Sequence, residues 1–394
     1  MKKIGLFIES EPFSGGMFQY NQVMLNAVSA LPKDKFSVVV VYTSGLWVKY
    51  FEAYDLKTVF AQSGFLGGAL GYAWRLLGLP KGVWRQICPY FHPIAKTLLR
   101  EKCDLWIFPS IDAWSYQAPV PALVSIYDLM HRYERRFPEV SAKGEFERRE
   151  KHHKNICKWA KGVLVDSKVG KQQVMESYGL EESRIFLLPY IAPGYIHSHK
   201  VSNDFDLRYN LPKKFIFYPA QFWEHKNHKG LISAVGRSIP VIQDLKLVLA
   251  GSKKNGYDSA KKLVKELKIE NHVLFLGYVP DEDMPELYRR ARALVMPTFF
   301  GPTNIPPLEA FVVGCPVAIS GIYGIPEQVG DAALLFNPGS IDEIAGCIRR
   351  LWTDDELCAE LIKKGKHRAS RWGQKQFNEQ LKEIIQQIVD EGKD

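Results

Sequence analysis

Short apolar runs alternate along the chain with longer segments in which apolar residues recur at helical spacing. The runs are rich in β-branched residues and end in turn formers, which is typical of strands buried in a parallel sheet. We predict strands in KKIGLFIES, FSVVVVYT, DLWIFPS, ALVSIYD and GVLVDS, and later in FIFYPA, LKLVLAG, HVLFLG, ALVMP, CPVAIS and ALLFNP. Strands that alternate with helices predict parallel sheets with helices on both faces.

The alternation starts again after about residue 200, which predicts an α/β protein of two doubly wound domains. We expect an N-terminal domain over residues 1–197 and a C-terminal domain over residues 198–374, joined by a polar linker near residues 192–212. The length of 394 residues agrees, because a single core stops growing at about 250–300 residues. Residues 375–394 have the spacing of an amphipathic helix, and we expect this helix to pack back on the N-terminal domain.

The composition is that of a globular protein without membrane-spanning helices. Apolar residues make up 46% of the chain, and no apolar segment reaches the ~18 residues that a transmembrane helix needs. The first residues, MKKIGLFIESEPFSGG, are too acidic and too short in apolar residues for a signal peptide. The six cysteines form no Cys-x-x-Cys pair, so we expect them to be reduced and buried. We therefore expect a cytoplasmic protein.

The net charge of +9 favours an anionic partner, such as a nucleotide phosphate, an acidic membrane or nucleic acid. No zinc finger, aromatic RNA-binding signature or basic tail is present, so we expect no nucleic acid. Two acidic triplets, at 204–206 and 281–283, have the Asp-x-Asp spacing of a metal site, but we interpret both as structural. His152 and His153 lie in a lysine-rich segment that predicts a solvated helix face. We expect no metal and no other cofactor.

Ligands of open parallel sheets bind at the carboxyl ends of the strands, so we expect the loops there to carry the functional residues. Gly15 and Gly16 lie between the first strand and a helix, where the backbone can approach an anion closely. A simple tight turn is the alternative. Lys226 lies at a helix start, where a cation opposes the helix dipole unless it binds an anion. A solvated loop is the alternative.

The segment FGPTNIPPLEA follows a predicted strand and opens a helix at Pro306 or Pro307. The free amide groups of that first turn can bind phosphate. Glu309 lies in the same turn, and its carboxylate can accept hydrogen bonds from two vicinal hydroxyls such as those of ribose. A glutamate that only stabilises the helix dipole is the alternative. Together the three loops indicate a site for a nucleoside diphosphate.

The segments PTFFGPTNIPPLEAFVVGCPVAIS and GIPEQVGDAALLFNP closely resemble the donor-binding region of family 4 glycosyltransferases, the glycosyl transferases group 1. The resemblance extends over nearly the whole chain through SGG, YDLMH, VDS, LPY, QFWEHKNH and FLGYV. It implies the GT-B fold, in which two Rossmann-like domains face a central cleft. The N-terminal domain would bind the acceptor and the C-terminal domain the nucleotide-sugar donor. It also implies a retaining, metal-independent hexosyltransferase.

Matched by position, the resemblance implies that Lys226 and Gly16 contact the diphosphate and that Glu309 contacts the ribose. It places the base against the backbone of the loop formed by Gly277, Tyr278 and Val279. The resemblance implies further donor contacts at Gly15, Gln221, Thr303, Asn304, Ile305 and Pro306. We expect Lys226, Glu309 and His131 to be the residues closest to the chemistry.

The chain departs from the family pattern at two donor positions. Gly301 stands where relatives carry the first glutamate of the Glu-x7-Glu motif, and we expect Thr303, Asn304 and nearby amides to replace it. Gln221 stands where relatives carry an arginine, and losing a guanidinium loses a bidentate diphosphate contact. Either another cation, Arg132 or Lys229, compensates, or the donor is held more loosely.

In the first half, Tyr127 and Asp128 stand where relatives often carry a His-Asp pair at the cleft. His131 follows three residues later and is either a cleft contact or a satisfied structural histidine. No carboxylate pair of the glycoside-hydrolase kind is evident.

We therefore predict transfer of a sugar from a nucleoside-diphosphate sugar, with a UDP-sugar favoured over GDP-mannose. The predicted acceptor is a glycan or a lipid-linked glycan of bacterial polysaccharide or oligosaccharide biosynthesis. A nucleotide-sugar-binding partner subunit with weak catalysis and a GT-B sugar-nucleotide epimerase are the alternatives. An NAD-dependent oxidoreductase is disfavoured, because the Gly-x-Gly-x-x-Gly fingerprint is absent.

Residues 64–100 mix aromatic and basic side chains, among them Trp74, Trp84, Arg75 and Arg85. Such mixtures bind anionic membrane surfaces, so a peripheral position on the inner face of the membrane is one interpretation. A helical hairpin with its aromatic residues packed inward is the other.

Overall fold

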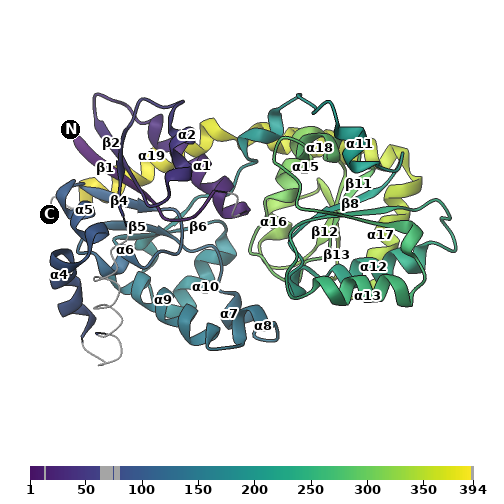
Figure 1. The fold of residues 1–394 in the computed structure, drawn as a ribbon, viewed down its shortest axis with the longest axis horizontal. Helices are drawn as coiled ribbons and strands as arrows, with labels where there is room; N and C mark the ends of the chain where they lie inside the picture. Colours follow the sequence, from purple (N-terminus) through teal and green to yellow (C-terminus); the bar gives the residue numbers. More distant parts are fainter. Residues whose placement is uncertain (13–14, 63–73, 75–79, 392–394) are drawn as a thin grey trace. The chain divides into compact units, whose positions relative to one another are not determined.

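The computed structural model describes residues 1–12, 15–62, 74 and 80–391. The chain divides into two compact units, each with its own sheet (Figure 1). Unit 1 comprises the described residues of 1–129, 146–189 and 374–394, and unit 2 comprises 130–145 and 190–373.

Two segments that the sequence interpretation placed in the N-terminal domain, residues 130–145 and 190–197, lie in unit 2. Ile196 is fully buried in the core of unit 2. Phe137 is buried in a small cluster with Phe300, which also belongs to unit 2. The domain boundaries therefore follow side-chain packing and do not coincide with a single point in the sequence.

Unit 1 contains seven parallel strands in the order β3-β2-β1-β4-β5-β6-β7. Its strands are β1 (Lys2–Ile8), β2 (Phe36–Tyr42), β3 (Lys57–Phe60), β4 (Leu105–Phe108), β5 (Ala122–Ser125), β6 (Gly162–Val165) and β7 (Ile185–Leu187). The chain runs outward from β1 to β3 and then continues on the other side of β1 with β4. The topological switch point, where open α/β sheets bind ligands, therefore lies between β1 and β4.

The helices of unit 1 are α1 (Gly16–Ser29), α2 (Val48–Phe51), α4 (Lys81–Phe91), α5 (Pro93–Arg100), α6 (Trp114–Gln117), α9 (Glu145–Trp159), α10 (Lys168–Tyr178) and α19 (Gln374–Glu391). The C-terminal helix α19 lies beside α1 (Figure 1). Its apolar face is buried through Phe377, Leu381 and Ile385. The amide of Gln374 donates to the carbonyl of Val23 in α1 at 3.3 Å.

Unit 2 contains six parallel strands in the order β10-β9-β8-β11-β12-β13. They are β8 (Ile216–Pro219), β9 (Leu247–Ala250), β10 (Val273–Gly277), β11 (Ala293–Met296), β12 (Val317–Ser320) and β13 (Ala333–Phe336). By the same reasoning as in unit 1, the switch point of this sheet lies between β8 and β11.

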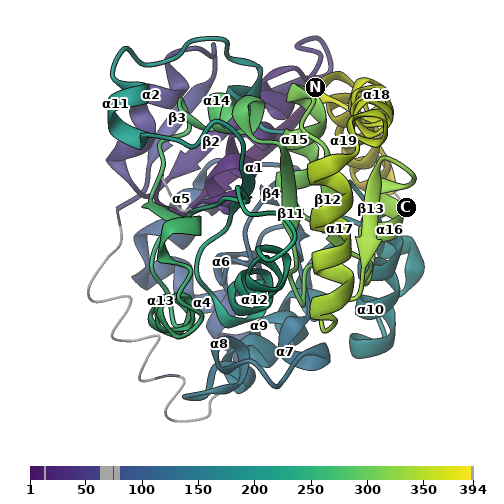
Figure 2. The ribbon, with the colours of Figure 1, turned by 90° about the vertical axis from the view of Figure 1, so that its right-hand side faces the viewer.

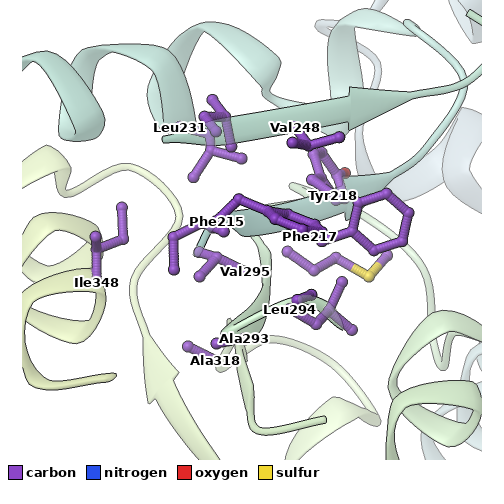
Figure 3. Close-up of a cluster of buried hydrophobic side chains, with 14 of the residues drawn as sticks. Phe215, Phe217, Tyr218, Leu231, Val248, Ala293, Leu294, Val295, Ala318 and Ile348 are labelled. Carbon is purple, nitrogen blue, oxygen red and sulfur yellow. The ribbon is translucent and has the colours of Figure 1, made fainter. Parts of the chain in front are cut away.

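The helices of unit 2 are α7 (Met130–Tyr133), α8 (Pro138–Ser141), α11 (Phe205–Tyr209), α12 (His228–Ser238), α13 (Tyr257–Glu266), α14 (Met284–Arg290), α15 (Pro306–Val313), α16 (Ile325–Val329), α17 (Ile341–Thr353) and α18 (Asp355–Arg371). Helices α12 and α17 pack side by side against the sheet (Figure 2). Side chains from β8, β9, β11 and β12 meet those of α12 and α17 in the core, with Phe217, Leu231 and Ile348 among them (Figure 3).

All eleven strands predicted from the sequence are confirmed. Most of them are largely buried, whereas β10 and β13 are only partly buried. The prediction missed β3 and β7. Strand β3 lies at the sheet edge, where three of its four residues are exposed, so it has no apolar run. Strand β7 has only three residues. Both pair through their backbones with a neighbour that the pattern did identify.

Several compositional predictions are also met in the described part of the chain. The six cysteines are buried and not disulfide-bonded. Asp283 is fully buried and accepts hydrogen bonds from Ser202, Arg208 and Tyr209, which agrees with a structural role for its acidic triplet. Across residues 1–12, 15–62, 74 and 80–391, no helix is long and apolar enough to cross a membrane.

Candidate functional site

In unit 2, the loops that follow β8 and β11 meet at the switch point of the sheet. The backbone N–H of Phe299, in the second loop, donates to the carbonyl of His225, in the first, at 2.7 Å. The hydroxyl of Thr298 donates to the same carbonyl at 3.3 Å. The two loops that the sequence singled out therefore form one connected surface at the place where this class of sheet binds ligands.

Lys226 lies in a single 3-10 turn, Glu224–Lys226, immediately before α12. Its carbonyl accepts a hydrogen bond from the hydroxyl of Tyr218 at 2.9 Å. The next residue, Asn227, adopts a left-handed conformation with φ of 57° and caps α12 by accepting from the backbone N–H of Gly230 at 3.1 Å. Hydrogen bonds thus fix the backbone both at Lys226 and at the residue that follows it.

Glu309 is buried in the first turn of α15, with 4% of its surface exposed. One carboxylate oxygen accepts from the hydroxyl of Tyr195, and the other accepts from the hydroxyl of Tyr288 at 2.6 Å. Burial raises the pKa of Glu309, and the nearby Asp281 raises it further. The two tyrosine hydroxyls lower this pKa but do not cancel the effect of burial, so it lies above the usual range of a glutamate. An ionised carboxylate has about four lone-pair positions, so two tyrosine donors leave acceptor capacity for a ligand.

Gly301, the position of the missing glutamate, has a φ of +139°, which disfavours side chains. A Cβ atom at this position would lie 2.8 Å from Nδ2 and 2.9 Å from Oδ1 of Asn304. The amide of Asn304 therefore fills the space in which a side chain at 301 would begin. Asn304 is 8% exposed, and its buried Nδ2 has no hydrogen-bond partner within the described residues. Its backbone is fixed by Gln328, which accepts from its N–H at 3.0 Å and donates to its carbonyl at 2.7 Å.

The other donor residues predicted in unit 2 lie on the same loops or at the end of the edge strand β10. The side-chain oxygen of Gln221 accepts from the indole N–H of Trp223 at 2.9 Å. Tyr278, which follows β10, is 56% exposed. Gly277 has a φ of +75°, and its carbonyl accepts from the N–H of Gly251 at 2.7 Å. Thr303, Ile305 and Pro306 lead into α15.

In unit 1, a pocket of about 430 Å³ lies at the switch point between β1 and β4. Its lining comes from the strand ends of β1, β4 and β5 and from helices α1 and α9: Glu9, Ser10, Met17, Ser110, Ile111, Asp112, Tyr127, Asp128, Arg148, Arg149, His152 and His153. Its walls combine carboxyl, guanidinium and imidazole groups with apolar surface, which suits a polyhydroxylated ligand.

Glu9 and Asp112 form a hydrogen-bonded carboxyl pair in this pocket. Asp112 is 4% exposed, and its Oδ1 accepts from the backbone N–H of Trp114 at 2.7 Å. Burial raises the pKa of Asp112 well above the usual range, and the adjacent Glu9 raises it further. Two carboxylates in contact repel each other, which favours the protonated form of Asp112.

The opposite wall of the pocket is formed by α9. Arg149 forms an ion pair with Asp128. The hydroxyl of Tyr116 lies 3.2 Å from Nδ1 of His152, and the pKa of His152 is lowered to about 4, chiefly by burial. The prediction of a solvated face for His152 and His153 is wrong, because this face of α9 packs inward and leaves His153 only 1% exposed.

Three predicted residues lie elsewhere. Gly15 and Gly16 open α1 in unit 1, where Gly15 has a φ of 68°. His131 lies in α7 and is fully buried, and it does not line the pocket of unit 1. Sequence reasoning missed Glu9 and Asp112, although each lies within four residues of the end of its strand, β1 or β4, where such sheets bind ligands.

Solved structures with this architecture share the GT-B fold. The crystal structure of Anabaena Alr3699/HepE in complex with UDP and glucose matches with a TM-score of 0.72 at 17% identity, over 98% of this chain and 99% of that chain. Sucrose-phosphate synthase from Thermosynechococcus elongatus matches with a TM-score of 0.73 at 19% identity, over 99% and 100%. The predicted fold class, two Rossmann-like units with parallel sheets, is confirmed.

Residues 201–368, most of unit 2, match the family described as Glycosyl transferases group 1, which confirms the resemblance read from the sequence for this part of the chain. The O-antigen chain mannosyltransferase B of Escherichia coli is 36% identical over 143 residues, which are 36% of this chain and 37% of the relative. Mannosylfructose-phosphate synthase of Agrobacterium fabrum is 25% identical over 57% of this chain and 52% of the relative. The chain thus spans about half or less of the length of these relatives.

Proposed function

We propose that the chain is a retaining hexosyltransferase that moves a sugar from a nucleoside-diphosphate sugar to a glycan hydroxyl in polysaccharide or O-antigen biosynthesis. The observation that carries this proposal is the meeting of the Lys226 turn and the 298–305 loop at the switch point of unit 2. At this place the cation of Lys226 and the amide groups at the start of α15 are suited to bind a diphosphate. The family match of the same residues and the mannosyltransferase relatives support it.

In the proposed reaction, the bond between the anomeric carbon and the diphosphate oxygen breaks, and a bond to the acceptor oxygen forms on the same face of the sugar. The acceptor proton moves to the departing phosphate oxygen, so no protein nucleophile is needed. Lys226 and the amides of α15 stabilise the charge that grows on the diphosphate. Glu309 holds the ribose hydroxyls, and the loop around Tyr278 holds the base. No metal or other cofactor is required.

We propose that Asn304 replaces the glutamate that relatives carry at position 301. Its side chain occupies the space where that glutamate would begin, and its Nδ2 has no partner within the described chain. A buried amide donor without a partner costs about 1–3 kcal/mol, which a hydroxyl of the donor sugar would recover on binding. The substitution Asn304→Ala should therefore raise KM for the nucleotide sugar more than it weakens binding of the nucleoside diphosphate alone.

We propose that the pocket of unit 1 receives the acceptor sugar. Carboxylates accept well from vicinal hydroxyls, and the protonated Asp112 leaves the second oxygen of Glu9 as the acceptor in the pocket. Glu9→Gln should weaken binding of a mannose- or glucose-terminated oligosaccharide, measured by saturation-transfer NMR, and leave nucleotide binding unchanged. Equal loss of both ligands would contradict a separate acceptor site in unit 1.

The proposed function is tested by thermal shifts with UDP, GDP, ADP and NAD⁺, each with EDTA or Mg²⁺. A ligand at 100 times its Kd stabilises by about 2.7 kcal/mol, which is a readable shift. A shift with UDP or GDP that EDTA leaves unchanged supports a metal-independent transferase and names the base. The relatives named mannosyltransferases support a mannose donor, whereas UDP is bound in the Anabaena structure. Binding without transfer would favour the partner-subunit alternative, and an epimeric product without acceptor would favour the epimerase.

We also propose that the α4–α5 region lies on an anionic membrane surface. Tyr90, Phe91 and Leu99 are exposed there together with the basic residues Lys96 and Arg100. Arg85 does not take part, because its buried guanidinium donates to the carbonyls of residues 116 and 120. Of the predicted region, residues 64–73 and 75–79 lie outside the described residues. Tyr90→Ser with Lys96→Glu should abolish co-sedimentation with vesicles that contain phosphatidylglycerol, and unchanged co-sedimentation would reject this surface.

A further inference from the structure

A segment from the first half of the sequence is part of the loop surface in unit 2. Residues 130–145, called here the brace segment, follow β5 in the sequence and precede α9. Phe137 is buried against Phe300 of the loop after β11. The guanidinium of Arg136 lies over the ring of Phe299, with 4.5 Å between its carbon and the ring centroid. The brace segment therefore contacts one of the two proposed donor loops through apolar packing.

The brace segment contacts the other loop through one carboxylate, that of Glu139. Its Oε1 accepts from the backbone N–H of His225 at 3.0 Å and lies 2.6 Å from Nδ1 of the same residue. The side chain of Glu139 is 7% exposed. Burial raises its pKa, but the hydrogen bonds from His225 and Asn255 outweigh burial and bring the pKa to about 2. Glu139 is therefore ionised at neutral pH.

The second oxygen of Glu139 extends the contact to the preceding residue of the turn. Its Oε2 accepts from Nδ2 of Asn255 at 3.0 Å, and Oδ1 of Asn255 accepts from the backbone N–H of Glu224 at 3.1 Å. One carboxylate thus fixes two successive backbone N–H groups, at residues 224 and 225, one directly and one through an amide. Lys226 is the next residue in the chain.

We propose that Glu139 is a positioning residue of the donor site, which holds the Glu224–Lys226 turn in the conformation in which Lys226 meets the diphosphate. This inference rests on the proposed function of Lys226. Partners of this kind, which orient the groups that bind a ligand, commonly change affinity by about 10- to 100-fold when they are lost. Glu139 touches neither the donor nor the reacting atoms in this proposal, and it acts through the backbone of the turn.

The substitution Glu139→Gln tests the proposal because the hydrogen bonds have a direction. In one orientation, the new amide NH₂ faces the Nδ2 donor of Asn255, and in the other it faces the N–H donor of His225. If Asn255 rotates its own amide to compensate, its NH₂ then faces the N–H of Glu224. Every arrangement places two donors against each other, so the turn must shift although the side chain keeps its size.

The double variant Glu139→Gln with Asn255→Asp restores the network. The new aspartate accepts from the NH₂ of the glutamine and from the N–H of Glu224, while the glutamine oxygen accepts from His225. We expect the affinity for the nucleoside diphosphate identified in the thermal-shift panel, measured by calorimetry, to fall about tenfold in the single variant. It should return to within about threefold of the wild type in the double variant.

Binding of the parent nucleoside, which has no phosphates, distinguishes loss of the Lys226 contact from a general structural defect. A general defect would weaken nucleoside binding as well. Its Kd, measured by NMR titration, should be the same in the wild type and Glu139→Gln, because only the contact of Lys226 changes. Glu134→Gln is the matched control: Glu134 lies in the brace segment and accepts from the hydroxyl of Tyr323 at 2.9 Å, but it does not contact the turn. We expect it to lower Tm and to leave the affinity for the diphosphate within twofold.

Unchanged diphosphate affinity in Glu139→Gln would overturn the proposal, as would an equal loss of nucleoside and diphosphate binding. If the wild-type protein binds no nucleoside diphosphate at all, the proposed function itself fails. The two failures are therefore distinguished by the wild-type measurement.

Discussion

The two units share one topology and differ in the chemistry at its switch point. In unit 1, the loops after β1 and β4 bring together the carboxyl groups of Glu9 and Asp112. In unit 2, the equivalent loops after β8 and β11 bring together Lys226 and the amide groups at the start of α15. The same backbone arrangement therefore presents hydrogen-bond acceptors for hydroxyl groups in one unit and a cation with amide donors for an anion in the other.

The two units also differ in how they accommodate buried carboxyl groups. Unit 1 avoids a second buried negative charge by keeping Asp112 protonated. Unit 2 keeps Glu139 ionised by giving it donors from His225 and Asn255, and it supplies Glu309 with two tyrosine hydroxyls. Substitutions in the two units should therefore affect different ligands and respond differently to pH.

The largest expected effect is that of Lys226→Ala in unit 2. Loss of a group that stabilises the growing charge of a leaving group commonly lowers kcat by about 10²–10³-fold, or about 2.7–4 kcal/mol. Steady-state kinetics with the donor measure this loss. Binding of the acceptor oligosaccharide to unit 1, followed by saturation-transfer NMR, should stay unchanged. Turnover within fivefold of the wild type would remove Lys226 from the proposed mechanism.

A second substitution tests the backbone on which unit 2 carries its donor loop. Gly301→Ala places a Cβ 2.8 Å from the amide of Asn304 and imposes a φ of +139° on alanine. We expect a loss of about 2–3 kcal/mol in the free energy of unfolding, measured by urea denaturation. Adding Asn304→Ala relieves the contact but not the backbone strain, so it should recover only part of the loss. Full recovery would show that the strain at 301 is negligible.

The site of unit 2 could be predicted from the sequence more fully than the site of unit 1, because its residues lie in motifs that are continuous in the sequence. Lys226 and Glu309 each stand in a motif that is continuous in the sequence, so strand, loop and helix start could be identified together. The Glu9–Asp112 contact depends on β4 pairing with β1, across about a hundred intervening residues. Sheet order is fixed by packing of the whole domain and not by local pattern, so this pair could not be predicted from either loop alone.

The brace segment shows that the domain to which a segment belongs also could not be predicted from local pattern. Its residues follow four correctly predicted strands of unit 1 and precede a fifth, so their position in the sequence indicated the N-terminal domain. The packing of Phe137 on Phe300 and the bonds from Glu139 to the turn place them in unit 2 instead. Burial of an aromatic side chain such as Phe137 stabilises a fold by about 1.5–3 kcal/mol. Packing of this kind, and not the position of a residue in the sequence, decides which unit the segment joins.

A smaller effect is expected from Asp112→Asn in unit 1. The native pKa of Asp112 is raised above the unfolded value of about 3.9, so the native state holds a proton that the unfolded chain loses, and stability falls as pH rises above about 4. Asparagine keeps the shape and a donor toward Glu9 without a proton to lose. We expect a gain of about 1–2 kcal/mol at pH 8 and none at pH 4, measured by denaturation at both values. An equal change at both would contradict a protonated Asp112.

The smallest expected effect is that of Tyr195→Phe in unit 2, which removes one of the two donors to Glu309. Loss of one hydrogen bond of this kind costs about 1 kcal/mol. Because the hydroxyl of Tyr195 lowers the pKa of Glu309, its removal raises that pKa further, and ionising the glutamate then costs more native stability. Denaturation curves should therefore show a larger deficit at pH 8 than at pH 5. The freed oxygen of Glu309 also gives a functional readout: discrimination between a ribonucleoside diphosphate and its 2′-deoxy analogue should be kept or increased. Lost discrimination with unchanged stability would mean that Tyr195, and not Glu309, reads the ribose.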